Sequence, residues 1–203
     1  MTHWIGILVS VACLLVAQTA MASPAVGPRD AVETAVARFM KIVHNTQPGG
    51  AAERTTEIRD IVREMFDFDE ISKRALSRHW QSLQTEDQAE FVTLFRDLLE
   101  RAYLAQVESV GDDQIAFLGV SIDAGGSAIV RSKVLTKHGS EIPLDYRLHV
   151  LNGRWRVYDV VVQGVSFIAS YRTQFDRVIR TESYGALRDR LVRKASETTA
   201  AQR

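Results

Sequence analysis

Apolar residues recur at the spacing of one helix face through most of residues 30–108. The stripe is clearest in residues 31–43, and Pro48-Gly49-Gly50 then interrupts it before further helical stretches. The longest helix is predicted to begin at Thr85, whose side chain can cap the first turn while Gln88 reaches back to the cap amide. This half of the chain is therefore predicted to be helical.

From about residue 112 the period of the apolar positions changes from about 3.6 to about 2. Turn-forming residues divide residues 112–163 into four β-like runs, and Asn152-Gly153 is the most specific of these turns because a type I′ hairpin needs positive φ at both positions. Helical periodicity returns over residues 165–195. This order predicts an α+β fold in which helices cover one face of a four-stranded antiparallel meander.

The first 22 residues have the composition of a secretory signal peptide. An apolar run from Trp4 to Ala17 precedes Ala20-Met21-Ala22, a small-residue pattern typical of a cleavage site. The run is about 14 residues long, whereas a membrane-spanning helix needs about 20, so we expect cleavage rather than an uncleaved anchor. Residues 23–203 are then predicted to form one domain without cysteine, because Cys13 lies in the removed segment. This suits an oxidising compartment.

Charge and side-chain chemistry argue against several classes of function. The chain has 25 basic and 25 acidic residues, and this balance gives no support for a nucleic-acid partner. No histidine has a second ligand at metal-binding spacing, and no glycine-rich phosphate loop occurs. Gly164-Val165-Ser166 begins like a nucleophile elbow, but Ile168 replaces the second glycine, so Ser166 is interpreted as a helix cap. We therefore predict no catalytic residue, no metal and no cofactor.

The segments from Trp155 to Ser166 and from Tyr171 to Phe175 form one recognisable pattern with three segments upstream. With these residues the sequence resembles the MlaC family, the periplasmic phospholipid-binding proteins also called toluene-tolerance auxiliary proteins. The likeness covers nearly the whole chain after the signal peptide. The upstream segments are Ile142 to Leu148, Phe66 to Asp69, and Ala75 to Trp80.

The resemblance implies a helical part packed on a curved antiparallel sheet, with an elongated apolar cavity between them. Acyl chains of a diacyl phospholipid would occupy the cavity while the headgroup stays outside. The protein would be periplasmic and would carry lipid between an outer-membrane lipoprotein complex and the substrate-binding component of an inner-membrane ABC transporter. Such shelter suits the cargo, because each methylene removed from water contributes about 0.8 kcal/mol.

Ten residues are predicted to line this cavity, chosen from the apolar faces of the strands and helices. Those from the sheet are Leu144, Tyr146, Leu148, Val157 and Val161, and those from the helices are Leu94, Leu98, Phe167, Ile168 and Tyr171.

Three alternatives stay open at this point. Hopanoid-associated relatives share the pattern, so the cargo could be a hopanoid or another apolar lipid. A small-molecule enzyme could use Tyr146 and Asp159 for acid/base chemistry, although an ion pair with an arginine such as Arg172 is a simpler role for Asp159. A ligand-free interaction module would use the apolar stripes only to close its core.

Overall fold

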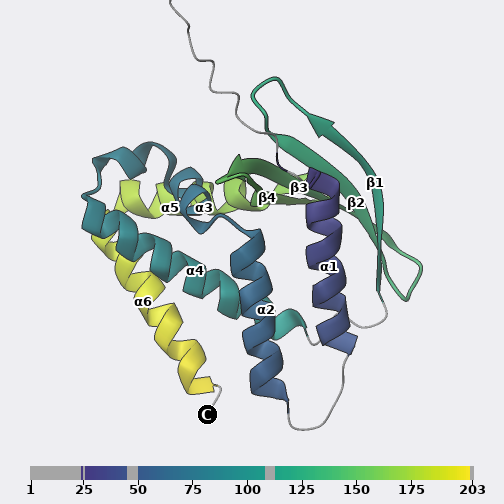
Figure 1. The fold of residues 1–203 in the computed structure, drawn as a ribbon. Helices are drawn as coiled ribbons and strands as arrows, with labels where there is room; N and C mark the ends of the chain where they lie inside the picture. Colours follow the sequence, from purple (N-terminus) through teal and green to yellow (C-terminus); the bar gives the residue numbers. More distant parts are fainter. Residues whose placement is uncertain (1–23, 25, 45–49, 108–112, 202–203) are drawn as a thin grey trace, which may run out of the picture.

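The computed structural model describes residues 24, 26–44, 50–107 and 113–201. The predicted signal peptide, residues 1–22, lies outside them. Figure 1 shows helices packed on a curved antiparallel sheet, which confirms the α+β fold. The helices are α1 (Pro28–His44), α2 (Ala51–Met65), α3 (Phe68–Leu76), the 3₁₀ helix η1 (Ser77–Ser82), α4 (Thr85–Val107), α5 (Phe167–Thr181) and α6 (Tyr184–Ala201). The strands are β1 (Gln114–Ile122), β2 (Ala128–Leu135), β3 (Glu141–Leu151), β4 (Arg154–Val162) and β5 (Val165–Ser166).

The sheet has five strands in the order of the sequence, not the four that the sequence predicts. The additional strand, β5, pairs with the end of β4. Gln163 and Gly164 have φ angles of 51° and 80°, so the chain reverses in a tight turn like that at Asn152 and Gly153, where φ is 50° and 73°. The last helix is also longer than predicted, because α6 continues to Ala201.

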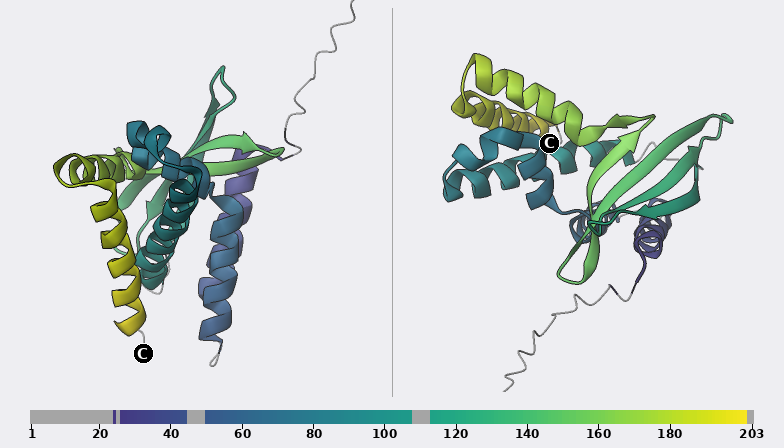
Figure 2. Two further views of the ribbon diagram at one scale, coloured as in Figure 1. Left: turned by 90° about the vertical axis from the view of Figure 1, so that its left-hand side faces the viewer. Right: turned by 90° about the horizontal axis from the view of Figure 1, so that it is seen from above.

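The helices form two groups that meet the sheet differently. Helices α1 and α2 pack against each other, α1 also against β1 and β2, and α2 against β4. Helices α3 to α6 pack among themselves, and α3 and α5 also contact β4. Seen from above in Figure 2, α4, α5 and α6 lie to one side of the strands, whereas α1 and α2 lie beneath them. Strand β4 therefore contacts both groups.

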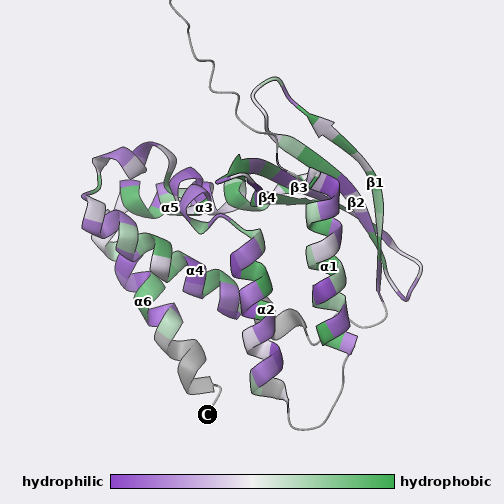
Figure 3. Ribbon diagram, viewed as in Figure 1, coloured by the Kyte–Doolittle hydropathy of each residue, from purple (hydrophilic) through white to green (hydrophobic). Residues whose placement is uncertain are grey.

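Each group has its own apolar core. The cluster beneath the sheet contains Val32 of α1 and Val130, Leu148 and Val157 of the strands, all with at most 1% of their surface exposed. The cluster of the second group is centred on fully buried Phe91 and Phe95 of α4. In Figure 3, hydrophobic and hydrophilic residues alternate around α1 and α2, as expected of helices that bury one face.

Two local predictions have different outcomes. Ser166 caps α5 as predicted, because its hydroxyl accepts a hydrogen bond from the Ala169 amide at 3.0 Å. Helix α4 begins at Thr85 as predicted, but the Gln88 side chain donates to the Trp80 carbonyl at 2.9 Å instead of pairing with the cap amide. None of the described helices is long and apolar enough to cross a membrane.

Candidate functional site

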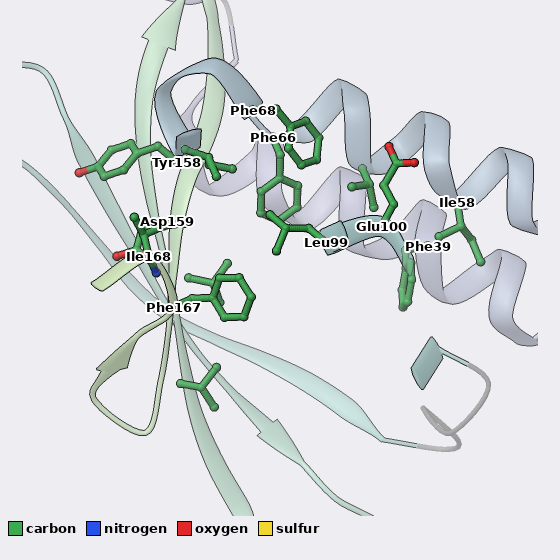
Figure 4. Close-up of a pocket in the computed structure, with 14 residues that line it drawn as sticks. Phe39, Ile58, Phe66, Phe68, Leu99, Glu100, Tyr158, Asp159, Phe167 and Ile168 are labelled. Atoms are coloured by element: carbon green, nitrogen blue, oxygen red, sulfur yellow. The ribbon is translucent and has the colours of Figure 1, made fainter. Parts of the chain in front are cut away.

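A cavity of about 360 Å³ lies between the helices and strand β4 (Figure 4). Its surface is almost wholly apolar, so a polar ligand placed there would lose its hydrogen bonds to water without replacement. The space is therefore suited to hydrocarbon. The lining residues are Phe39 of α1, Ile58 and Val62 of α2, Phe66, Phe68 and Ile71 at α3, Leu99 and Glu100 of α4, Tyr158, Asp159, Val160 and Val162 of β4, and Phe167 and Ile168 of α5.

Two of the lining phenylalanines lie where α2 leads into α3: Phe66 in the link and Phe68 as the first residue of α3. Asp67, between them, is buried; one of its oxygens accepts from the Glu70 amide at 3.0 Å, which caps α3, and the other lies 2.8 Å from His149 Nε2. Its backbone amide donates to the Val157 carbonyl at 2.9 Å. The link is thereby tied to the sheet, and the flanking Phe66 and Phe68 rings, 6.3 Å apart, both reach the cavity.

A β-bulge in β4 decides which side chains of this strand reach the cavity. Arg147 pairs with Asp159 and the next residue, Leu148, pairs with Val157, so Tyr158 is an extra residue. The bulge reverses the alternation of the strand. Trp155 and Val157 face the helices before the bulge, and after it Val160 and Val162 do so, opposite Tyr146 and Leu144.

Asp159 is turned to the other face of the sheet and is fully engaged there. Its carboxylate accepts hydrogen bonds from Arg147 at 3.1 Å, from the Ser166 hydroxyl at 2.6 Å and from the Ile168 amide at 3.1 Å. The arginine that it contacts is thus Arg147, not the Arg172 suggested by the sequence. Asp159 and Tyr146 lie on opposite faces, so they do not form an acid/base pair. Burial also raises the pKa of Tyr146, which weakens it as an acid.

Glu100, one of the two acidic residues that line the cavity, is held by arginines. Glu100 is 6% exposed and accepts two hydrogen bonds from Arg63 of α2, at 2.7 and 3.0 Å, while Arg59 and Arg96 lie 3.6 and 3.9 Å away. The hydrogen bond with Glu100 raises the pKa of Arg63. This ion pair joins α2 to α4 at the edge of the cavity. Among the described residues, no group of three His, Cys, Asp or Glu side chains could hold a metal ion.

The structure distributes the ten predicted lining residues over several environments. Phe167 and Ile168 line the cavity. Tyr146, Leu148 and Val157 are buried in the core beneath the sheet, and Leu144 packs against it. Leu94, Leu98 and Tyr171 pack against the core of the second helix group. Val161 pairs with Asp145 and lies on the same face of the sheet as Asp159.

Sequence reasoning missed most of the wall of the cavity. Phe39, Ile58 and Val62 lie in apolar helical stretches and could have been proposed from their spacing. Val160 and Val162 could not have been proposed, because strict alternation from Val157 places them on the face of the sheet away from the cavity. No glycine or proline in β4 signals the bulge.

A family model described as MlaC protein matches residues 33–193, a span that includes the whole sheet and most of both helix groups. The chain belongs to the MlaC family. The family resemblance proposed from the sequence is therefore confirmed, and the apolar cavity lies within the part of the chain that matches the MlaC model.

Two known proteins are similar to this chain, one in structure and one in sequence. The phospholipid-binding protein from Ralstonia solanacearum, solved in complex with a phospholipid, is similar in structure with a TM-score of 0.75 at 25% identity, over 86% of this chain and 99% of that one. The toluene tolerance protein ttg2D of Pseudomonas putida is 28% identical over 116 residues, 57% of this chain. The match spans 54% of the Pseudomonas protein, about half its length.

Proposed function

We propose that this protein binds a diacyl phospholipid by its acyl chains in the apolar cavity and carries it through the periplasm. Its docking partners would be an outer-membrane lipoprotein complex and the substrate-binding component of an inner-membrane ABC transporter. The observation that carries the proposal is the hollow of about 360 Å³ with an almost wholly apolar surface. The phospholipid found in the Ralstonia relative supports it.

The energetics of the cargo explain why such a carrier needs no catalytic group. Two chains of sixteen carbons lose roughly 25 kcal/mol if they enter water, at about 0.8 kcal/mol for each methylene. A bilayer and the apolar cavity shelter them to a similar degree, so exchange between the two lies near balance. Docking to a partner, rather than bond chemistry, would then set the direction of transport.

The geometry favours this function over the two alternatives from other classes. An enzyme that paired Tyr146 with Asp159 would need both side chains on one face of the sheet, and the bulge at Tyr158 separates them. A ligand-free interaction module would need no hollow, whereas side chains leave the space beside β4 unfilled.

Variants that fill the cavity test the proposal. Val62→Trp and Val160→Trp each place an indole in the space from opposite walls, and Val192→Trp, at a 45% exposed position of α6, is the matched control. After gentle purification from a bacterial periplasm, mass spectrometry of extracted lipids should find about one diacyl phospholipid on the wild-type protein and the control, and severalfold less on the two filled variants.

Circular dichroism confirms that each variant is folded before its lipid content is compared. Full lipid occupancy in a folded Val62→Trp and Val160→Trp double variant would contradict binding in this cavity. A hopanoid in place of the phospholipid in the wild-type extract would identify the other cargo that the sequence left open.

A further inference from the structure

A second cavity, of about 540 Å³, lies on the opposite side of the bulge in β4. We call it the basic pocket. It shares Tyr158, Asp159 and Ile168 with the apolar cavity, so the two spaces adjoin at the bulge. Its lining residues are Lys73, Arg74 and Ser77 of the α3 end, Asp123 and Ser127 of the β1–β2 turn, Ile129, Arg147, Tyr158 and Asp159 of the sheet, and Ser166, Ile168, Ala169 and Arg172 of β5 and α5.

Its two carboxylates are already satisfied by hydrogen-bond donors. Asp123 accepts from the amides of Gly125 and Ser127, each at 2.9 Å. Asp159 accepts from one arginine, one hydroxyl and one amide, as described above. Asp159 is already paired with a cation, and four cationic side chains line the pocket against these two carboxylates.

The four cations are less fully matched. Arg147 pairs with Asp159, and Arg74 pairs with Glu70 at 2.7 Å. Lys73 is 3.7 Å from the same Glu70, so one carboxylate serves two cations. Arg172 makes no hydrogen bond or ion pair with any described residue, and it is exposed at the first turns of α5. The pocket therefore has an excess of positive charge directed into it.

Tyr158 lies at the boundary between the two spaces. Its ring lines both cavities, and the Arg74 guanidinium stacks on it 4.0 Å from the ring centre. In Figure 4 the Tyr158 hydroxyl points away from Phe66 and Phe68. One side of the bulge is thus apolar, and the other offers cations and hydroxyl groups.

We propose that the basic pocket binds phosphate, and that its source is the phosphodiester headgroup of a lipid whose acyl chains occupy the apolar cavity. The inference rests on the proposed function. Guanidinium groups donate in a planar fork that matches phosphate oxygens, and Lys73 adds a mobile point charge. The headgroup would then lie outside the hydrocarbon cavity but in contact with the basic pocket. The protein would therefore bind lipids that carry a phosphate more tightly than lipids that lack one.

A competition between two lipids with the same acyl chains tests the headgroup. Delipidated protein is incubated with phosphatidylglycerol vesicles that contain diacylglycerol, reisolated, and its bound lipids are measured. The wild-type protein should be enriched in the phospholipid over the vesicle composition. The enrichment of the Lys73→Gln/Arg172→Gln variant should be at least about tenfold lower than that of the wild-type protein, because a single charge-assisted contact already contributes about a factor of ten.

The matched control is Lys137→Gln/Arg177→Gln. It removes the same two charges from exposed positions outside the basic pocket, one of them also on α5, and should keep the wild-type enrichment. Equal loss in both variants would show a general effect of net charge and overturn the site.

Calorimetric titration of the delipidated protein with inorganic phosphate separates the two sources of the anion. Binding that only Lys73→Gln/Arg172→Gln abolishes, with phospholipid enrichment unchanged, would support a phosphate site that takes free phosphate and overturn its assignment to the headgroup. No phosphate binding and no change in enrichment would overturn the site altogether. A wild-type protein that takes neither lipid would refute the carrier function, and the phosphate titration would still decide the basic pocket.

Discussion

Helix α4 borders two apolar regions that differ in how completely side chains fill them. Along its first half, the fully buried Phe91 and Phe95 contact Phe175 of α5 with ring centres 5.7 and 5.1 Å apart, and Tyr171 lies 5.0 Å from Phe95. Further along the same helix, Leu99 borders the hollow of about 360 Å³. Hydrophobic side chains are thus common to a packed core and to an open cavity.

The difference lies in what faces the helix. Aromatic rings from α5 interdigitate with those of α4 and exclude space from the first region. The second region is lined partly by short side chains, Val62 of α2 and Val160 and Val162 of β4, and the buried Glu100–Arg63 ion pair spans its edge. Polar anchoring and short side chains together hold the helices in place without filling the interior.

The largest effect is expected when an aromatic ring is removed from each region in turn. Phe95→Ala should lower the free energy of unfolding by about 3–5 kcal/mol, because neighbouring rings cannot collapse into the space left behind. Phe39→Ala, at the cavity, should cost only about 1 kcal/mol, since that side chain already borders an empty space. Denaturant unfolding of the delipidated proteins measures both, and similar losses would mean that the two regions are equally well packed.

A smaller effect is expected from the ion pair at the cavity edge. Glu100→Gln removes the carboxylate shared by three arginines and should destabilise the protein by about 2 kcal/mol, less than for a fully buried pair because Arg59 and Arg63 can hydrate. Glu64→Gln is the control, since its pair with Arg38 is about half exposed and should contribute at most about 0.5 kcal/mol. If thermal unfolding showed equal destabilisation by the two substitutions, the Glu100 ion pair would contribute no more to stability than an exposed pair.

The smallest effect concerns pH and the packed helix group. Hydrogen bonds from His79 and Arg78 hold the pKa of Asp176 below its usual range. A carboxyl with a lowered folded pKa stabilises the protein above its unfolded pKa of about 3.9, and this stabilisation is lost as pH falls through the folded pKa. Asp176→Asn should therefore reduce the fall in Tm between about pH 5 and about pH 2.5. An unchanged acid dependence would show that this contact is not coupled to folding.

Local patterns were sufficient for the elements and the family. Three of these patterns depend only on neighbouring residues: the period change near residue 112, the Asn152-Gly153 turn and the Ser166 cap. Each is decided by the local backbone conformation and its hydrogen bonds, so the sequence predicts it without knowledge of distant contacts. The short strand β5 was missed because two residues carry no periodicity, and only its pairing with β4 defines it.

The lining of the cavity was less predictable because it depends on contacts distant in sequence. Val161 was a reasonable choice by alternation from Val157, yet the bulge turns it to the other face of the sheet and brings Val160 to the cavity instead. A bulge is a property of two paired strands, and a single strand's sequence does not reveal its register.

The amino-acid sequence established the α+β class, most helix and strand positions, and membership of the MlaC family, because periodicity and short motifs are properties of neighbouring residues. The tertiary structure decided where apolar side chains meet and where they leave a hollow, which face Asp159 occupies, and how Arg172 comes to share a pocket with Lys73. Volume and charge at these places are set by residues from separate elements, and no linear pattern specifies the distance between them.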